Sequence, residues 1–143
     1  MSGRFLTSKG QSSLEFFLVV GIAIAVSTPF ILAAQRSVVN IQQTQEITTL
    51  QKSLDRMQEA VNTVSVSGAP ARRTFLVNLP DSVTGAQVIQ DTAVVYTVRR
   101  GSDRVNLTRV FNTNISAPDG LPTESGRVTV FAWRGQVNIT EVN

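Results

Sequence analysis

The pattern of apolar and polar residues divides the chain into a continuous apolar run, a periodic segment and a set of short alternating segments. Residues 16–34 contain no charged side chain. An apolar run of about 17–25 residues is long enough to cross a bilayer as a helix. We therefore expect one long helix over residues 11–67, with its apolar half at 16–34.

Beyond Arg36 the apolar residues become periodic. Spacings of three and four residues place them on one helical stripe, which consists of Ile47, Leu50, Leu54, Met57, Val61 and Val64. A short stripe is typical of a helix that packs on a globular domain, and a coiled-coil seam is the alternative. The β-branched run 63–66 and then Gly68 should end the helix. Residues 11–66 as one helix would measure about 84 Å at 1.5 Å per residue.

The proline and the charged pairs of this helix lead to two further predictions. Pro29 lacks a backbone donor and should bend or open the helix, with Ser27 and Thr28 helping to satisfy the freed carbonyls. In the periodic segment, the pairs Lys52–Asp55 and Arg56–Glu59 have the spacing of local charge compensation.

Residues 68–143 form short alternating runs separated by turn residues. Alternation predicts strands at 74–79, 93–100, 104–111, 127–133 and 136–142, a weak strand at 86–90 and a loop at 116–125. Arg134-Gly135 has the composition of a short hairpin turn, and Phe75, Phe131 and Trp133 are expected in the core or the hairpin. The predicted fold class is α+β: a long N-terminal helix, membrane-spanning and then amphipathic, with a head of five or six antiparallel strands.

Composition argues against catalysis. The chain has 143 residues, no Cys and no His, which removes disulfides, thiolate metal sites and the usual general base. No phosphate-binding loop, dinucleotide fingerprint or nucleophile elbow is present, and the acids are scattered. We expect no enzyme activity, no catalytic residue, no metal and no cofactor. Without Arg4 and Lys9 the 13 basic residues fall to 11, against 10 acidic ones, so nucleic acid is not an expected partner.

The residues ahead of the apolar run are the most informative part of the chain. They include, in order, Lys9, Gly10, Gln11, Ser13 and Glu15. Basic residues before an apolar helix favour a cytoplasmic N-terminus. A lone acid at the edge of such a helix is costly in lipid, so it usually has a partner or a function.

This order of residues resembles the precursor of an archaeal type IV pilin with a class III signal peptide. The family pattern places Leu four residues after the Glu, where this chain has Val19 beside Leu18. The resemblance implies that a prepilin peptidase recognises those five residues and cuts between Gly10 and Gln11. The leader would then be residues 1–10, and the mature chain would consist of the helix 11–67 and the head 68–143.

The resemblance also implies a function. The mature chain would be a structural subunit of a surface filament that mediates adhesion, assembled as a helical homo-oligomer through Glu15, Phe16, Phe17 and Leu18. Glu15 would pair with the new amine of Gln11, because a paired ammonium and carboxylate are buried more cheaply than either charge alone. The implied partners are the peptidase, a pilus assembly ATPase and its membrane platform. The precursor would lie in the cytoplasmic membrane and the product in an extracellular pilus.

Three other interpretations stay open. An ordinary signal peptide could end at Ala33-Ala34, which would make Gln35 the first mature residue. The protein could be a monomeric membrane-anchored extracellular β-domain that binds a ligand. It could also be a subunit of the archaellum, although that family usually lacks this Gln-x-Ser-x-Glu order.

The head carries three N-glycosylation sequons and one basic cluster. The sequons begin at Asn106, Asn114 and Asn138, and they are acceptor sites if the head is extracellular. Two of them fall on outward positions of predicted strands. Arg99-Arg100 and Arg104 flank a predicted turn and are expected to form a solvated basic tip, with contact to anionic surface polymers or to a neighbouring subunit as the alternative.

Overall fold

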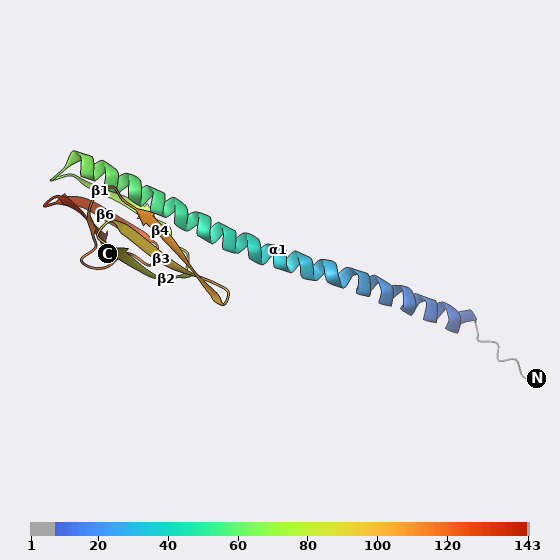
Figure 1. Ribbon diagram of the computed structural model, residues 1–143. Helices are drawn as coiled ribbons and strands as arrows, with labels where there is room; N and C mark the ends of the chain where they lie inside the picture. The colour runs from blue at the N-terminus through green and yellow to red at the C-terminus, as the bar shows by residue number, and fades with distance from the viewer. Residues whose placement is uncertain (1–7, 143) are drawn as a thin grey trace, which may run out of the picture. The chain divides into compact units, whose positions relative to one another are not determined.

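The computed structural model describes residues 8–142. The chain divides into two compact units, Met1–Gln42 and Gln43–Asn143. Helix α1 (Ser8–Ser67) runs through the boundary (Figure 1). It begins three residues before the predicted start and ends where the sequence predicts, at Gly68. The Gly68 N–H makes the last helical hydrogen bond, to the Val64 carbonyl at 2.9 Å, and the left-handed φ of 68° at Gly68 then turns the chain out of the helix.

The N-terminal unit is helical through its proline. The helix is uninterrupted at Pro29, the only proline inside it. Its missing N–H frees the Ala25 carbonyl. The Ser27 and Thr28 hydroxyls instead donate to the carbonyls of Ala23 and Ile24, both at 2.7 Å. The prediction that these hydroxyls compensate the proline was therefore wrong, because each reaches back four residues from its own position and stops short of Ala25.

Within residues 8–142, the second unit contains seven strands: β1 (Arg72–Val77), β2 (Val83–Ile89), β3 (Ala93–Arg100), β4 (Asp103–Val110), β5 (Ile115–Ser116), β6 (Gly126–Trp133) and β7 (Gln136–Val142). They form a four-stranded sheet of order β1-β6-β7-β5 and a three-stranded sheet of order β2-β3-β4. The α+β fold class, a long helix followed by a sheet-rich head, is confirmed.

Two features of the head differ from the prediction. The short strand β5 brings the number of strands in residues 8–142 to seven and not the predicted five or six, and it pairs with β7 in parallel, so the head is not purely antiparallel. It lies at the start of the predicted loop 116–125, and two residues cannot show alternation. The weak strand predicted at 86–90 is a full strand, β2, which contains a bulge between Val83 and Gly85. The Arg134-Gly135 turn is confirmed, since both residues have positive φ, 49° and 82°.

The helix stripe is part of the core of the head. Leu50, Leu54, Met57, Val61 and Val64 are at most 2 % exposed, and they belong to one cluster with residues of both sheets. The sheets contribute Val77, Val94, Tyr96, Val98, Val128, Val130, Val137 and Ile139. The stripe therefore packs on the globular head, as the favoured interpretation predicted, and is not free to form a coiled-coil seam.

The charges on this part of the helix pair with the sheets and not along the helix. Asp55 lies 2.6 Å from Arg109 on β4, and Glu59 lies 3.7 Å from Arg73 on β1. The expected intrahelical partners Lys52 and Arg56 make no ion pair with them in the described part of the chain. Each of the two sheets thus contributes one arginine that forms an ion pair with an acid of α1.

Tyr96, the only tyrosine of the chain, gives the head a pH-dependent stability. It is fully buried, and its hydroxyl donates to the Pro122 carbonyl at 3.0 Å. Burial raises the pKa of Tyr96 well above its ordinary value near 10, and the Glu141 carboxylate raises it further. Above about pH 10 the unfolded chain releases this proton while the folded head retains it. Stability should therefore fall by up to about 1.4 kcal/mol per pH unit.

Denaturant unfolding of a fragment of residues 43–143, which contains the whole core cluster, measures this slope between about pH 9 and about pH 11. The variant Tyr96→Phe should lose the slope and, at neutral pH, about 1 kcal/mol of stability with its hydrogen bond. Tyrosinate absorbance that appears at pH 10 in the folded fragment would contradict the assignment.

Candidate processing and assembly site

The expected cleavage point lies in the first turn of α1. Lys9, Gly10 and Gln11 are helical and exposed, and residues 1–7 of the expected leader, with Arg4, lie outside the described residues. The first four N–H groups of a helix have no intrahelical acceptor. Gly10 is a poor helix former, and Lys9 places a positive charge at the positive end of the helix dipole. The Gly10–Gln11 bond is therefore in the part of the helix that opens at the lowest cost.

Gln11 and Glu15 share one face of the helix. They are four residues apart, a spacing that makes neighbours on a helix surface, and side chains lean toward the N-terminus. Glu15 is exposed, and no ion pair engages it within residues 8–142. Cleavage before Gln11 would create an ammonium group one helical turn from this carboxylate. The geometry suits an ion pair that exists only after processing. Ser13 is likewise exposed, but it lies two residues from Glu15 and on a different face.

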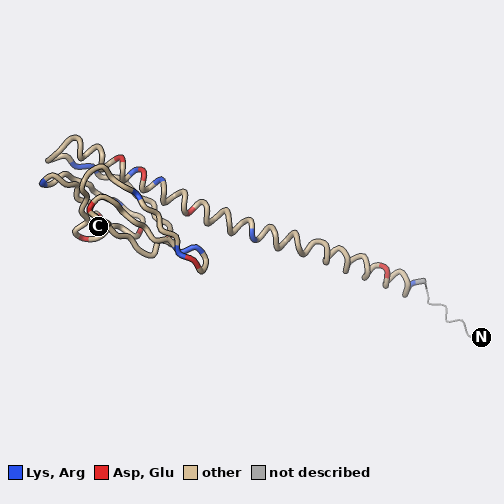
Figure 2. The backbone as a smooth tube through the Cα atoms, viewed as in Figure 1, with Lys and Arg blue, Asp and Glu red and all other residues tan. Residues whose placement is uncertain are grey.

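The residues after Glu15 form an exposed apolar surface. Phe16, Phe17 and Leu18 are 65 %, 71 % and 59 % exposed, and the two phenyl rings meet edge to face at 6.2 Å. The uncharged stretch continues to residue 35 and is visible in the N-terminal half of α1 (Figure 2). Within the described chain, α1 is the one helix long and apolar enough to cross a membrane. It is a candidate membrane anchor.

The three sequons are distributed over both sheets. Asn106 is exposed on β4, and its Oδ1 accepts a hydrogen bond from the Thr97 hydroxyl at 3.0 Å. Asn114 is exposed in the loop before β5, and its carbonyl accepts the Val137 N–H at 2.9 Å. Asn138 is half-buried on β7, between β6 and β5. The structure therefore brings Asn114 beside β7, the strand of Asn138, and leaves Asn106 on the other sheet.

We expect the three sequons to be occupied unequally if modification follows folding. Asn114 should carry the most glycan because it lies exposed in a loop, Asn106 less, and Asn138 least because it is half-buried in a central strand position. Glycopeptide mass spectrometry of protein recovered from cells would measure each occupancy. Matched Asn→Gln variants at the three positions provide the control, and highest occupancy at Asn138 would refute the ranking.

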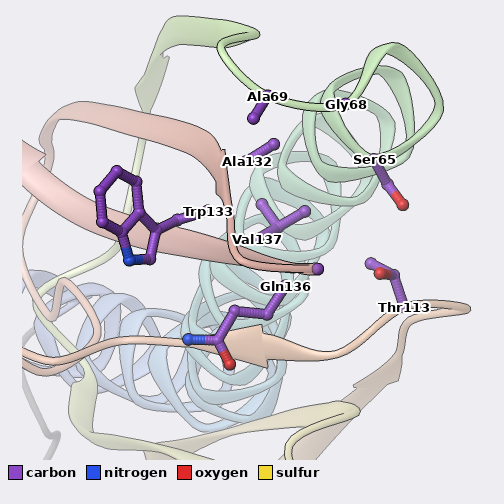
Figure 3. Close-up of a pocket in the computed structure, with 9 residues that line it drawn as sticks. Ser65, Gly68, Ala69, Thr113, Ala132, Trp133, Gln136 and Val137 are labelled. Carbon is purple, nitrogen blue, oxygen red and sulfur yellow. The ribbon is translucent and has the colours of Figure 1, made fainter.

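A small cavity lies where the end of α1 meets the β6–β7 hairpin (Figure 3), and two shallower hollows of the head are lined in part by Asp81, Asp91 and Glu124. The small cavity has a volume of about 100 Å³, and its lining includes Ser65, Thr113 and Gln136 but no ionisable side chain. No group of three or more metal-ligating residues occurs among the described residues.

Comparison of the chain with protein-family models, with curated proteins and with solved structures finds no match.

Sequence reasoning missed a set of side chains on the four-stranded sheet. Arg72 on β1 lies opposite Phe131 on β6, and Trp133 at the end of β6 lies opposite Gln136 on β7. The alternation within each strand was visible in the sequence, but the order β1-β6-β7 that makes these residues neighbours was not. Of these two strand pairings, only β6–β7 could be predicted, from the Arg134-Gly135 turn.

Proposed function

We propose that the protein is the precursor of a structural subunit of a surface filament, of the kind formed by archaeal type IV pilins. The observation that carries the proposal is the position of Glu15. This lone carboxylate lies four residues after Gln11 and directly before an exposed, uncharged helical run. A membrane anchor has no need of a charge at that point, whereas a subunit with a new amine at Gln11 does.

The proposed assembly follows from the exposed apolar side chains of α1. In the precursor, lipid covers the run 16–34. After cleavage between Gly10 and Gln11, the helix leaves the membrane and packs against copies of itself. Outside the lipid, burying the apolar surface of the helix against other copies contributes roughly 25 cal/mol per Å² to the free energy of assembly. A heterologous contact that does not close into a ring yields an open helical polymer.

The process requires partners that the chain does not supply. A prepilin peptidase cuts the leader, and an assembly ATPase with its membrane platform extracts the subunit from the bilayer. The head has its own core, which is complete within residues 43–142. It therefore stays folded when the environment of the N-terminal helix changes, and it faces the exterior, where it mediates adhesion.

N-terminal sequencing and intact-mass measurement of protein sheared from the cell surface test this function. A mature start at Gln11 is the expected result. A start at Gln35 would indicate an ordinary signal peptide instead. An intact leader, with protein recovered only from membranes, would indicate a monomeric anchored binding domain. Loss of swimming in a deletion strain, with filaments that start at Gln11, would assign the subunit to an archaellum.

A further inference from the structure

The solvent-facing side of the four-stranded sheet has an unusual chemistry. We define the outer face as the surface formed by the outward-pointing side chains of β1, β6 and β7 and of the turn after β6. On the inner side, Val128, Val130, Val137 and Ile139 alternate with these positions and are buried in the core. The outer face presents three guanidinium groups, from Arg72, Arg127 and Arg134, and two aromatic rings, from Phe131 and Trp133.

Two of the guanidinium groups lie near the aromatic rings. Cζ of Arg72 lies 5.6 Å from the centre of the Phe131 ring, and Cζ of Arg134 lies 5.6 Å from that of the Trp133 ring. Trp133 is 53 % exposed although it is large and apolar. Trp133, Gln136, Ala132 and Val137 all line the cavity, and in Figure 3 the indole and the Gln136 amide point to the other side from the Ala132 and Val137 side chains. Each guanidinium is therefore within cation–π distance of its ring, and its N–H donors can still pair with an anion.

No carboxylate shares the outer face with these arginines in the described part of the head, and Glu141, next to the β7 partner of Arg127, follows the inward alternation of that strand. The outward positions of β1, β6 and β7 include no Asp or Glu. The two ion pairs found in residues 8–142 use other arginines, Arg73 and Arg109, whose partners are on the helix. Three cationic groups thus face solvent without an acidic neighbour on their own surface, which favours an external anion.

Neither sheet of a second copy complements this surface in charge. The outward positions of the three-stranded sheet carry Arg99 and Arg104 and likewise include no acid. Packing the outer face of one head against that sheet of another would therefore oppose like charges. Packing two outer faces together would do the same. Charge complementarity requires a partner that is itself anionic.

We propose that the outer face binds an acidic polysaccharide. Carboxylate or sulfate groups would pair with the Arg72 and Arg134 guanidinium groups, and the apolar faces of sugar rings would pack on Trp133. The neighbouring Gln136 amide and the Thr74 hydroxyl suit sugar hydroxyl groups. A nucleic acid fits less well, because phosphate contacts supply essentially all of its sequence-independent binding and this face offers three guanidinium groups.

This inference deepens the adhesive part of the proposed function and rests on the head being outside the cell. Binding itself requires neither leader cleavage nor assembly. A chain that fails the N-terminal sequencing test can still bind the polymer, and a true filament subunit can fail to bind it. The two failures are therefore distinguishable.

The experiment measures binding of the full chain in detergent micelles to immobilised polygalacturonate. Fully methyl-esterified polygalacturonate, which has the same backbone without charge, is the matched ligand control. We expect the acidic polymer to bind, with an affinity that falls as salt rises, and the ester to bind much more weakly. Arg72→Gln and Arg134→Gln should each weaken binding by about tenfold. Trp133→Ala should weaken it similarly, and Trp133→Phe should restore part of the loss.

Arg104→Gln, which removes the same charge from the other sheet, should leave the affinity unchanged. Circular dichroism melting checks that every variant is folded. The proposal is overturned if the chain does not bind polygalacturonate, or if the ester binds equally. It is also overturned if Arg104→Gln weakens binding as much as Arg134→Gln does, or if single-stranded DNA of equal charge binds more tightly than the polysaccharide.

Discussion

Replacing Glu15 with glutamine should leave leader cleavage intact and abolish filament assembly. Glutamine keeps the size and polarity of the side chain, so the helix and the Gly10–Gln11 bond are undisturbed. The ammonium of Gln11 would then enter the filament core without its carboxylate, which sits four residues away on the same helix face. Leaving one charge of a buried pair uncompensated costs about 3–5 kcal/mol, enough to reduce polymer below detection.

Immunoblotting of sheared surface fractions measures the assembled protein, and the mobility of the membrane-bound protein measures cleavage. Glu124→Gln, in an exposed loop of the head, is the matched control and should assemble normally. Normal filaments from Glu15→Gln would remove the ion-pair role. An uncut Glu15→Gln precursor would mean that the peptidase requires the charge of Glu15 and not only its size and polarity.

The helix could be predicted because its determinants are local. Uncharged residues 16–34, the three-four spacing of the stripe and the Gly68 stop are all properties of neighbouring residues in the sequence. The same locality made the candidate processing site visible. Gln11 and Glu15 become neighbours on any helix, whatever the rest of the chain does.

The head could be predicted only where pairing is local. The β6–β7 hairpin followed from its two-residue turn, whereas β5 consists of two residues and exists because β7 offers a free edge. Asp55 and Glu59 found arginines on β4 and β1 and not the lysine and arginine on their own helix. The sheets that pack on the helix stripe place arginines next to these two acids, and these arginines replace the partners that helical spacing predicts. No sequence pattern reveals where the sheets lie on the helix.

The outer face was hidden for the same reason. Arg72 and Phe131 are far apart in the sequence and become opposite residues only through the β1–β6 register. The pairing of β1 with β6 depends on how the whole head folds around its core, and not on residues that are close in the sequence. Any single strand therefore shows an unremarkable alternation, and the shared chemistry appears only when three strands are placed side by side.

Leu54→Ala should destabilise the head by about 2–5 kcal/mol, a large part of the stability of a small domain. Leu54 lies on helix α1 but is 2 % exposed, within the core cluster that includes both sheets. Truncation would leave a cavity that the surrounding valines, stiff at χ1, cannot fill. Denaturant unfolding of the full chain in detergent micelles, followed by circular dichroism of the β-sheet signal, measures the loss.

Leu32→Ala is the matched control: the same change on the same helix, at a residue that is 51 % exposed and lies in the apolar run. It should leave the stability of the head unchanged. Equal losses from the two variants would mean that the stripe is not part of the core of the head. If only Leu54→Ala is costly, the head cannot separate from residues 50–64 without unfolding. The apolar part of the helix would then be the only part free to exchange lipid for neighbouring subunits.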